Sequence, residues 1–285
     1  MIFEHEIPSD SKLYFGKSAK IKRDIESRSS HLLESLGFEE IVTPVFSYHQ
    51  HDSFEDQSQL IKLNDDHNHT VTLRADSTPD VVRIATKRLG RSMEFKKWFY
   101  IQPTLNFPTQ EQYQIGGEIL QGNFSEALDV TISLLGALEL QPMLQLANIR
   151  IPQLLNEKYG ISLELLKSMQ IEKILANDLP WIERLVAIHT IDDLSDLNIF
   201  PDDIKQELLK IKLEAQRLDY KPLIISPLFY AKMRYYDSLT FKMFSGNALL
   251  AMGGEYVIDD LKAAGFAIYT DECIAMKIRI NEENK

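Results

Sequence analysis

The order in which strand-like and helix-like segments follow one another limits how this chain can fold more than any other feature. A helical pattern at 21–36 ends at Gly37, and the region 151–218 is helical throughout. Strand patterns fill the remaining segments: 38–48, 59–63, 70–75, 96–103, 113–121, 222–230, 238–244 and 248–254. Because the strands do not alternate with single helices as in doubly wound folds, the order predicts an α+β fold. We expect an antiparallel sheet flanked by helices, with a helical insertion.

Proline and turn residues set two of the strand boundaries. Pro44 interrupts the strand pattern 38–48, and a proline cannot donate a hydrogen bond to a strand ladder. Pro44 is therefore expected at a sheet edge, a bulge or an interface. The polar run at 64–69, NDDHNH, is predicted to be the turn of a hairpin between the flanking strands.

Capping residues predict where two helices begin. Thr78 precedes Pro79 and an acid, so it is expected to be the N-cap of a helix, and Ser125 is expected to cap a helix at 125–140. In the tail, residues 259–265 are predicted to be helical and to precede a short strand at 265–269.

Composition narrows the class of protein. The chain has 285 residues, 44% of them hydrophobic, and no apolar run of membrane-spanning length or signal-peptide type, so a cytoplasmic globular protein is expected. The single Cys273 excludes an internal disulfide and a cysteine cluster for zinc. The net charge of -11 argues against a nucleic-acid partner, since such binding depends on Lys and Arg. The basic run at 87–97 is either a solvated helix end and loop or a local basic patch.

The strand-loop-strand at 99–120 is rich in carboxylates and amides but contains no Lys or Arg. Gln114 and Glu118 lie four residues apart on one predicted strand and therefore share a face. Carboxylates pair well with ammonium groups, so a cationic amine is the expected ligand.

Six residues are predicted to form a small polar pocket. They supply two acids, an amide, a hydroxyl and two phenols: Asp76, Thr78, Gln114, Glu118, Tyr235 and Tyr236. A second interpretation stays open from spacing alone, in which Asp76 only caps a helix and Glu118 faces water.

Motifs for other chemistry are weak or absent from the sequence. It contains no GxxxxGK[ST], GxGxxG or GxSxG motif. The histidine pairs at 49–51 and 67–69 fall in predicted loops, so solvated turn histidines are expected rather than a metal site. Gly116 and Gly117 allow either a bulge or the close approach of a ligand. We predict no cofactor, no metal and no catalytic residue.

In their order along the chain, these segments resemble the catalytic core of class II histidyl-tRNA synthetases. The matching words, each beside the family's own, are LRADST (73–78) with LRPEGT, QIGGE (114–118) with QLGCE, MRYYDSLTF (233–241) with GLDYYTGTVF, GGEY (253–256) with GGRYD, and GFAIYTDEC (265–273) with GFAMGLERL. GFEEIVTPVFSY (37–48) resembles the first class II motif, through which these enzymes form dimers.

The resemblance covers nearly the whole chain and implies its domain organisation. It implies a class II aminoacyl-tRNA synthetase-like core at 1–150 and 219–285, a helical insertion at 151–218, and no anticodon-binding domain. It also implies that the six pocket residues correspond to those that meet the ammonium and imidazole groups of histidine.

Departures from the synthetase pattern fall on the positions of four arginines, in the second motif, the histidine-specific element, the GGRYD element and the third motif. These positions hold Asn106, Ala231, Glu255 and Cys273 here. Charge-assisted hydrogen bonds contribute about 1.5–3 kcal/mol each. The loss of several would remove most of the electrostatic stabilisation that adenylation requires. Arg234 also stands where the synthetases have an Asp, so an effector could bind either in the pocket or at a subunit interface.

A synthetase-like site without its arginines resembles a second family, the regulatory subunits of ATP phosphoribosyltransferase. The Asp76 in LRADST, in place of Glu, strengthens this resemblance. It implies a non-catalytic subunit that joins a short-form catalytic subunit in the first step of histidine biosynthesis, with histidine as a feedback effector. It also implies a dimer formed through the first class II motif around Pro44.

Two alternatives belong to other functional classes. A divergent ligase of the histidyl-tRNA synthetase type would still activate an amino acid, using other cations such as Arg74, Arg83 or Lys232. A binder of tRNA-like structures would need a basic surface, and the overall charge argues against it.

Overall fold

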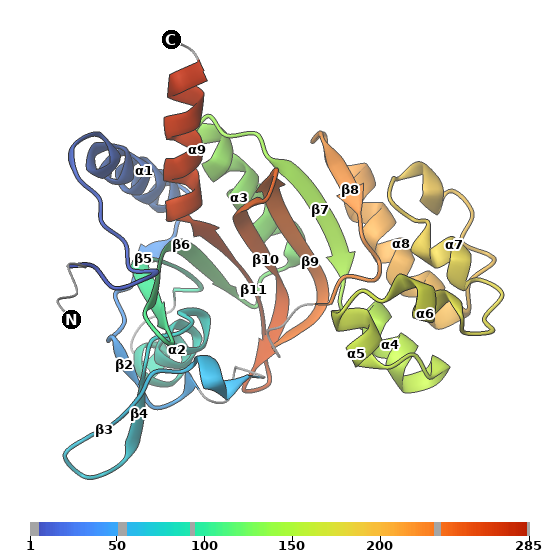
Figure 1. Cartoon of the computed structure of the whole chain (residues 1–285), viewed down its shortest axis with the longest axis horizontal. Coiled ribbons are helices and arrows are strands. Elements are labelled where there is room, and N and C mark those ends of the chain that lie inside the picture. The colour runs from blue at the N-terminus through green and yellow to red at the C-terminus, as the bar shows by residue number, and fades with distance from the viewer. Residues whose placement is uncertain (1–5, 51–55, 92–94, 231–234, 284–285) are drawn as a thin grey trace, which may run out of the picture.

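The computed structural model describes residues 6–50, 56–91, 95–230 and 235–283. Within these residues an eight-stranded sheet forms the centre of the molecule, in the order β1-β5-β6-β11-β10-β9-β7-β8 (Figure 1). Its strands are β1 (Glu39–Glu40), β5 (Lys97–Asn106), β6 (Gln110–Leu120), β7 (Met143–Asn148), β8 (Leu223–Ile225), β9 (Tyr236–Ser245), β10 (Ala248–Ile258) and β11 (Leu261–Tyr269). The inner neighbours are antiparallel, and the two edge pairs β1–β5 and β7–β8 are parallel. The predicted α+β class, with a sheet flanked by helices, is confirmed.

A smaller sheet is formed by the N-terminal hairpin region. It contains β2 (Phe46–Ser47), β3 (Lys62–Asn64) and β4 (Thr70–Leu73) in the order β2-β4-β3. The predicted hairpin is confirmed, because β3 and β4 pair antiparallel on either side of the 64–69 turn. The interruption at Pro44 is confirmed too, since β1 and β2 lie on either side of it and belong to different sheets.

Three helices cover one face of the large sheet: α1 (Gly16–Ser35), α3 (Phe124–Ala137) and α9 (Thr270–Glu283) (Figure 1). Ile115 and Ile119 of β6 belong to the same buried core as Leu134 of α3. Because side chains alternate along a strand, Gln114 and Glu118 of β6 point to the other face. That face, away from the three helices, carries the polar site.

The predicted helical region forms the connection between two parallel neighbours in the sheet. Strands β7 and β8 pair in parallel, and a parallel pair requires a long crossover. The crossover consists of α4 (Arg150–Tyr159), α5 (Leu163–Lys167), α6 (Ile171–Leu175), α7 (Ile182–Val186) and α8 (Asp202–Arg217). In Figure 1 these helices lie together beyond the β7–β8 edge of the sheet.

Short helical segments complete the fold. After β4, α2 (Thr78–Arg83) continues into a π turn, Ile84–Arg88, and a 3₁₀ turn, Leu89–Arg91. Other 3₁₀ turns lie at Gln57–Gln59 and Asp192–Leu194. Among the helices of the described ranges, none is both long and apolar enough to cross a membrane.

The helix predicted at 259–265 is wrong, because most of this segment belongs to strand β11. Asp259 and Asp260 have φ values of 50° and 64° and form a tight turn that pairs Ile258 with Leu261. Two consecutive residues with positive φ are typical of the turns that join antiparallel strands. Pairing with β6 and β10 therefore overrides the helix propensity of the Leu-Lys-Ala-Ala sequence.

The two predicted helix caps are also wrong, and the strand predicted at 222–230 is shorter than expected. Helix α3 is capped by Asn123, whose side chain accepts the Glu126 amide, whereas the Ser125 hydroxyl donates to Glu214. Thr78 is the first residue of α2 rather than its cap, and its hydroxyl points into the sheet. In both cases the hydroxyl donates to a carboxylate distant in the chain, Glu214 or Glu118, and does not cap its own helix.

Candidate functional site

Two carboxyl groups approach each other on the polar face of the sheet. Asp76 lies between β4 and α2, and Glu118 lies on the central strand β6. The Thr78 hydroxyl donates to Glu118 Oε1 at 2.7 Å, and the Thr78 amide donates to Asp76 Oδ1 at 3.2 Å. Thr78 thus links the two acids. Asp76 therefore receives a helix-start hydrogen bond and also faces the pocket.

Glu118 is the most deeply buried acid of the site. Its residue is 1% exposed, so the interpretation in which it faces water is wrong. Tyr256 donates to Oε2 at 2.5 Å, and Tyr100 donates to Oε1 at 3.3 Å. Burial raises the pKa of Glu118 to about 8, against the hydrogen bonds from Tyr256 and Thr78 that lower it.

Asp76 is held by both its side chain and its backbone. The Tyr235 hydroxyl donates to Oδ2 at 2.8 Å, and burial raises the pKa of Asp76 to about 6. The Gln50 side chain accepts from the Asp76 amide and donates to the Asp76 carbonyl, both at 2.8 Å. Gln50 also donates to the buried Asp80 at 2.8 Å. Gln50 is a positioning residue that lies far from the pocket in sequence, and sequence reasoning missed it.

Tyrosine rings form one wall of the site. Tyr235 packs against Tyr236 and Tyr256, with ring centroids 5.0 and 5.5 Å away. Burial raises the pKa of all three phenols well above the ordinary value. The hydroxyls therefore remain protonated at neutral pH and can donate hydrogen bonds.

Glycines leave room for these polar groups. A Cβ on Gly265 would lie 2.0 Å from Glu118 Oε2, and a Cβ on Gly116 would lie 2.2 Å from the Tyr100 ring. A Cβ on Gly117, on the opposite face, would meet the Phe266 ring. The strand glycines therefore admit side chains of the protein itself, which is the close approach that such positions permit.

A cavity of about 450 Å³ opens over these groups. All six residues predicted from the sequence line it: Asp76, Thr78, Gln114, Glu118, Tyr235 and Tyr236. Small-molecule sites commonly have volumes of roughly 300–1,000 Å³. The site can therefore enclose a molecule of amino-acid size, with two carboxyl groups and several phenols to receive a polar cation.

Two cations and part of the crossover also line the cavity. Lys242 comes from β9, and Leu166, Lys167 and Met169 come from the α5 region of the crossover. Sequence reasoning missed these residues. The sequence offered little indication of them. Lys242 directly follows the MRYYDSLTF segment, and the residues of α5 match no motif.

The positions of the missing arginines are occupied by groups without positive charge. Asn106 lines the cavity, donates to the Ala75 carbonyl at 3.5 Å and keeps its own buried Oδ1 without a partner. Glu255 accepts the Phe124 amide at the start of α3, and Cys273 is buried in the core. Ala231 lies outside the described residues.

Two of the cations considered for a ligase are committed elsewhere. Arg74 donates to the carbonyl oxygens of Thr43, Pro44 and Pro103 at 2.9–3.1 Å. Arg83 lies 3.5 Å from Asp259 and does not line the cavity. Lys232 lies outside the described residues. The basic run at 87–97 includes Lys87 and Lys97, which pair with acids at 2.6 and 2.7 Å.

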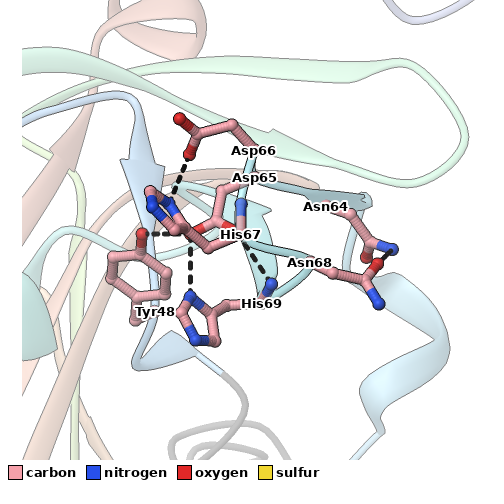
Figure 2. A network of polar contacts seen from close by, with 7 residues as sticks. All are labelled: Tyr48, Asn64, Asp65, Asp66, His67, Asn68 and His69. Atoms are coloured by element: carbon pink, nitrogen blue, oxygen red, sulfur yellow. Dashed lines mark hydrogen bonds and ion pairs between the residues drawn. The ribbon is translucent and has the colours of Figure 1, made fainter.

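The histidines of the β3–β4 turn belong to a separate exposed network, shown in Figure 2. Asp65 accepts the backbone amides of His67 and His69 and the Tyr48 hydroxyl, and these bonds lower its pKa to about 2. Asp65, Asp66 and His67 form the one metal-like cluster found in the described ranges, and it is mostly exposed. These hydrogen bonds stabilise the β3–β4 turn, and that structural role is sufficient to explain the cluster.

Comparisons with known proteins place this arrangement among its relatives. A family model described as histidyl-tRNA synthetase matches residues 15–273. A protein from Wolinella succinogenes named ATP phosphoribosyltransferase regulatory subunit is 45% identical over 284 residues, 99% of each chain. A protein of the same name from Helicobacter hepaticus is 40% identical over 276 residues, 96% of this chain and 98% of the relative.

Solved structures agree on the fold. A structure from Bacillus halodurans, described as an ATP phosphoribosyltransferase regulatory subunit/histidyl-tRNA synthetase, has a TM-score of 0.81 at 18% identity and covers 96% of this chain and 84% of its own. Histidyl-tRNA synthetase from Nostoc has a TM-score of 0.71 at 14% identity, covering 97% of this chain and 75% of its own. Both similarities place the sheet and its helices in the histidyl-tRNA synthetase-like class II fold.

Proposed function

Because the chain belongs to the histidyl-tRNA synthetase-like family of ATP phosphoribosyltransferase regulatory subunits, we propose that it performs no catalysis and regulates a separate catalytic subunit. The partner is a short-form ATP phosphoribosyltransferase catalytic subunit, which condenses ATP with phosphoribosyl pyrophosphate. This glycosyl transfer is the first step of histidine biosynthesis. The complex acts in the cytoplasm, and the regulatory chain needs no cofactor.

One observation carries this proposal. The cavity brings together six polar residues suited to an amino acid. At the described positions where the synthetases have an arginine, this chain has Asn106, Glu255 and Cys273. A triphosphate would need several cations directed at it. Arg74 is bonded to backbone carbonyls instead. The site therefore suits recognition of an amino acid without its activation.

Histidine is the effector that we assign to the cavity. Its ammonium group would lie against Glu118 and Asp76, and the phenols of Tyr235 and Tyr236 would surround its imidazole. Bound histidine would lower the activity of the partner through a coupling free energy, typically about 1–3 kcal/mol. Residues 151–218 would act as an insertion into a core made of 1–150 and 219–285.

We also propose that the chain forms a dimer through the first class II motif around Pro44. Val42 is 76% exposed and Phe46 is 61% exposed, on either side of this proline. Arg74 fixes the segment by bonds to the carbonyls of Thr43 and Pro44. The two apolar side chains are thus presented on a rigid backbone, as a self-complementary interface requires.

Complex formation tests this function directly. The chain and the short-form catalytic subunit from the same source would be mixed, and the mass of the eluting species measured by light scattering. We expect one species heavier than either protein alone, and separate elution would contradict the proposed partnership.

The ligase alternative has one observation in its favour, the pair of lysines in the cavity. Amino-acid-dependent exchange of pyrophosphate into ATP tests it. We expect no exchange at high protein concentration, and measurable exchange with histidine would replace the regulatory function by catalysis. A gel shift with bulk tRNA at low salt is expected to stay blank, since the net charge is -11.

A further inference from the structure

The cavity has an uneven distribution of charge. Its two carboxyl groups, Asp76 and Glu118, come from the β4–α2 junction and β6, whereas its two lysines, Lys167 and Lys242, come from α5 and β9. Among the described residues that line it, these two lysines are the only cations. Acids and lysines thus enter one small cavity from different elements.

Aromatic rings hold both ammonium groups at the cavity wall. Lys242 Nζ lies 4.1 Å from the centroid of the Phe229 ring, and Lys167 Nζ lies 5.3 Å from the centroid of the Tyr230 ring. Both distances are within the range of cation–π attraction. Phe229 and Tyr230 are consecutive and also line the cavity, so a single short segment orients the two cations.

Asn106 also lines the cavity but carries no positive charge. One N–H of its side-chain amide donates to the Ala75 carbonyl, and its buried Oδ1 has no partner. An unpaired acceptor repels a carboxylate and favours a ligand N–H. At this position the synthetases that the chain resembles carry an arginine. Among the described residues of the lining, the positive charge that an anion would meet therefore lies with Lys167 and Lys242.

We propose that Lys167 and Lys242 bind the carboxylate of a zwitterionic amino-acid effector whose ammonium group faces Asp76 and Glu118. This inference rests on the proposed effector site and adds the residues that recognise the second charge of the ligand. It also gives the crossover a role, because Lys167 is the last residue of α5. A bound amino acid would bridge the sheet and the crossover.

Binding of two ligands that differ in one group tests the assignment. Calorimetry on the full chain would compare histidine with histidinol, in which a hydroxymethyl group replaces the carboxylate. For Lys167→Gln and Lys242→Gln we expect about 10- to 100-fold weaker histidine binding, the loss of one charge-assisted hydrogen bond, with histidinol affinity unchanged. Lys173→Gln, on the neighbouring exposed part of the crossover, should bind both ligands as the wild type does.

Three other outcomes distinguish the role of the two lysines from the existence of the effector site. If the wild type binds histidine and both lysine variants retain its affinity, the lysine assignment is overturned while the effector site stands. If the variants weaken histidine and histidinol equally, their role is structural and the assignment is again overturned. A wild type that binds neither ligand would overturn the effector site and the assignment together. Thermal unfolding of each variant, with Lys167→Arg as a charge-retaining rescue, verifies that folding is intact.

Discussion

Glu118 is buried among three hydroxyl donors and a second acid, and no cation of the described residues forms an ion pair with it. Its pKa of about 8 and that of Asp76, about 6, have the same first cause, the removal of water from the carboxyl group. At neutral pH the unliganded Glu118 therefore carries a proton for most of the time. An arriving ammonium group would favour the ionised form and displace that proton.

Stability should therefore depend on pH through Glu118. Its folded pKa of about 8 lies above its ordinary value of 4.5, so its contribution is fully present below pH 4.5 and is lost as the pH rises towards 8. At about 1.4 kcal/mol per pKa unit, this loss amounts to several kcal/mol. Glu118→Gln cannot ionise, so between pH 5 and pH 8 its free energy of unfolding should fall less than that of the wild type. Urea titrations at the two pH values measure this.

Glu111→Gln is the matched control, because Glu111 lies on the same strand and outside the cavity. It should follow the wild type at both pH values. Equal losses for Glu118→Gln and the wild type would contradict a buried, protonated Glu118.

The same two variants separate binding from stability. Glu118→Gln should weaken histidine binding by roughly tenfold or more, because a charge-assisted bond to the ammonium is lost. Glu111→Gln should have little effect. Calorimetry at pH 7.5 distinguishes them, and equal effects would mean that the ligand binds elsewhere, for example at a subunit interface.

Histidine affinity should rise with pH between 6 and 8. Binding of an ammonium ion requires ionised Glu118, so each molecule bound below pH 8 should release up to one proton, and affinity should fall by at most tenfold per pH unit on acidification. Calorimetry in buffers of different ionisation enthalpy counts the protons. Proton uptake, or affinity that does not change from pH 6 to 8, would contradict the assigned contact.

Arg74 has a structural role that its sequence context did not reveal. Its guanidinium group holds three carbonyl oxygens of two separate segments. Arg74→Met should lower the free energy of unfolding by about 3 kcal/mol or more, because these acceptors would be left buried and unpaired. Arg88→Met, at an exposed site, should change it by less than about 0.5 kcal/mol. Chemical unfolding measures both, and similar values would refute the structural role.

At the scale of elements, sequence patterns predicted the alternating strands well and the turn chemistry poorly. Strand β6 has apolar and polar residues on opposite faces, and its two faces lie on the core and the cavity as expected. The strand predicted at 265–269 is the second half of β11, whereas the first half was mistaken for a helix, since the turn at Asp259 and Asp260 contains no glycine or asparagine to mark it. Residues 261–269 form a strand because they pair with β6 and β10, and local propensity carries no information about these pairings.

The segment around Pro44 provides a prediction that tests the proposed dimer. Val42→Glu and Phe46→Glu should leave the fold intact, because both side chains are exposed. Each should give a monomer where the wild type is expected to be a dimer, because a charge would be buried at the proposed interface. Leu213→Glu, on an exposed position of α8, is the matched control. Light scattering gives the masses, and a wild-type monomer or unaffected variants would overturn this interface.

For the whole molecule, the sequence was sufficient to identify the six polar residues that the fold brings into one cavity. It did not reveal Gln50, Lys167 or Lys242. Gln50 bonds to the backbone of Asp76, and Lys167 lines the cavity because α5 of the crossover between β7 and β8 ends beside it. Such contacts join segments that are distant in the sequence, so they cannot be predicted from local sequence patterns.

The regulation of a separate catalytic subunit by this chain can be measured as a rate. The rate of phosphoribosyl-ATP formation by the short-form catalytic subunit would be measured with and without this protein, and then with increasing histidine. We expect activation by the wild type that histidine reverses, and activation by Glu118→Gln that histidine reverses only at much higher concentration. A catalytic subunit whose rate is the same with and without this protein would rule out the regulatory function.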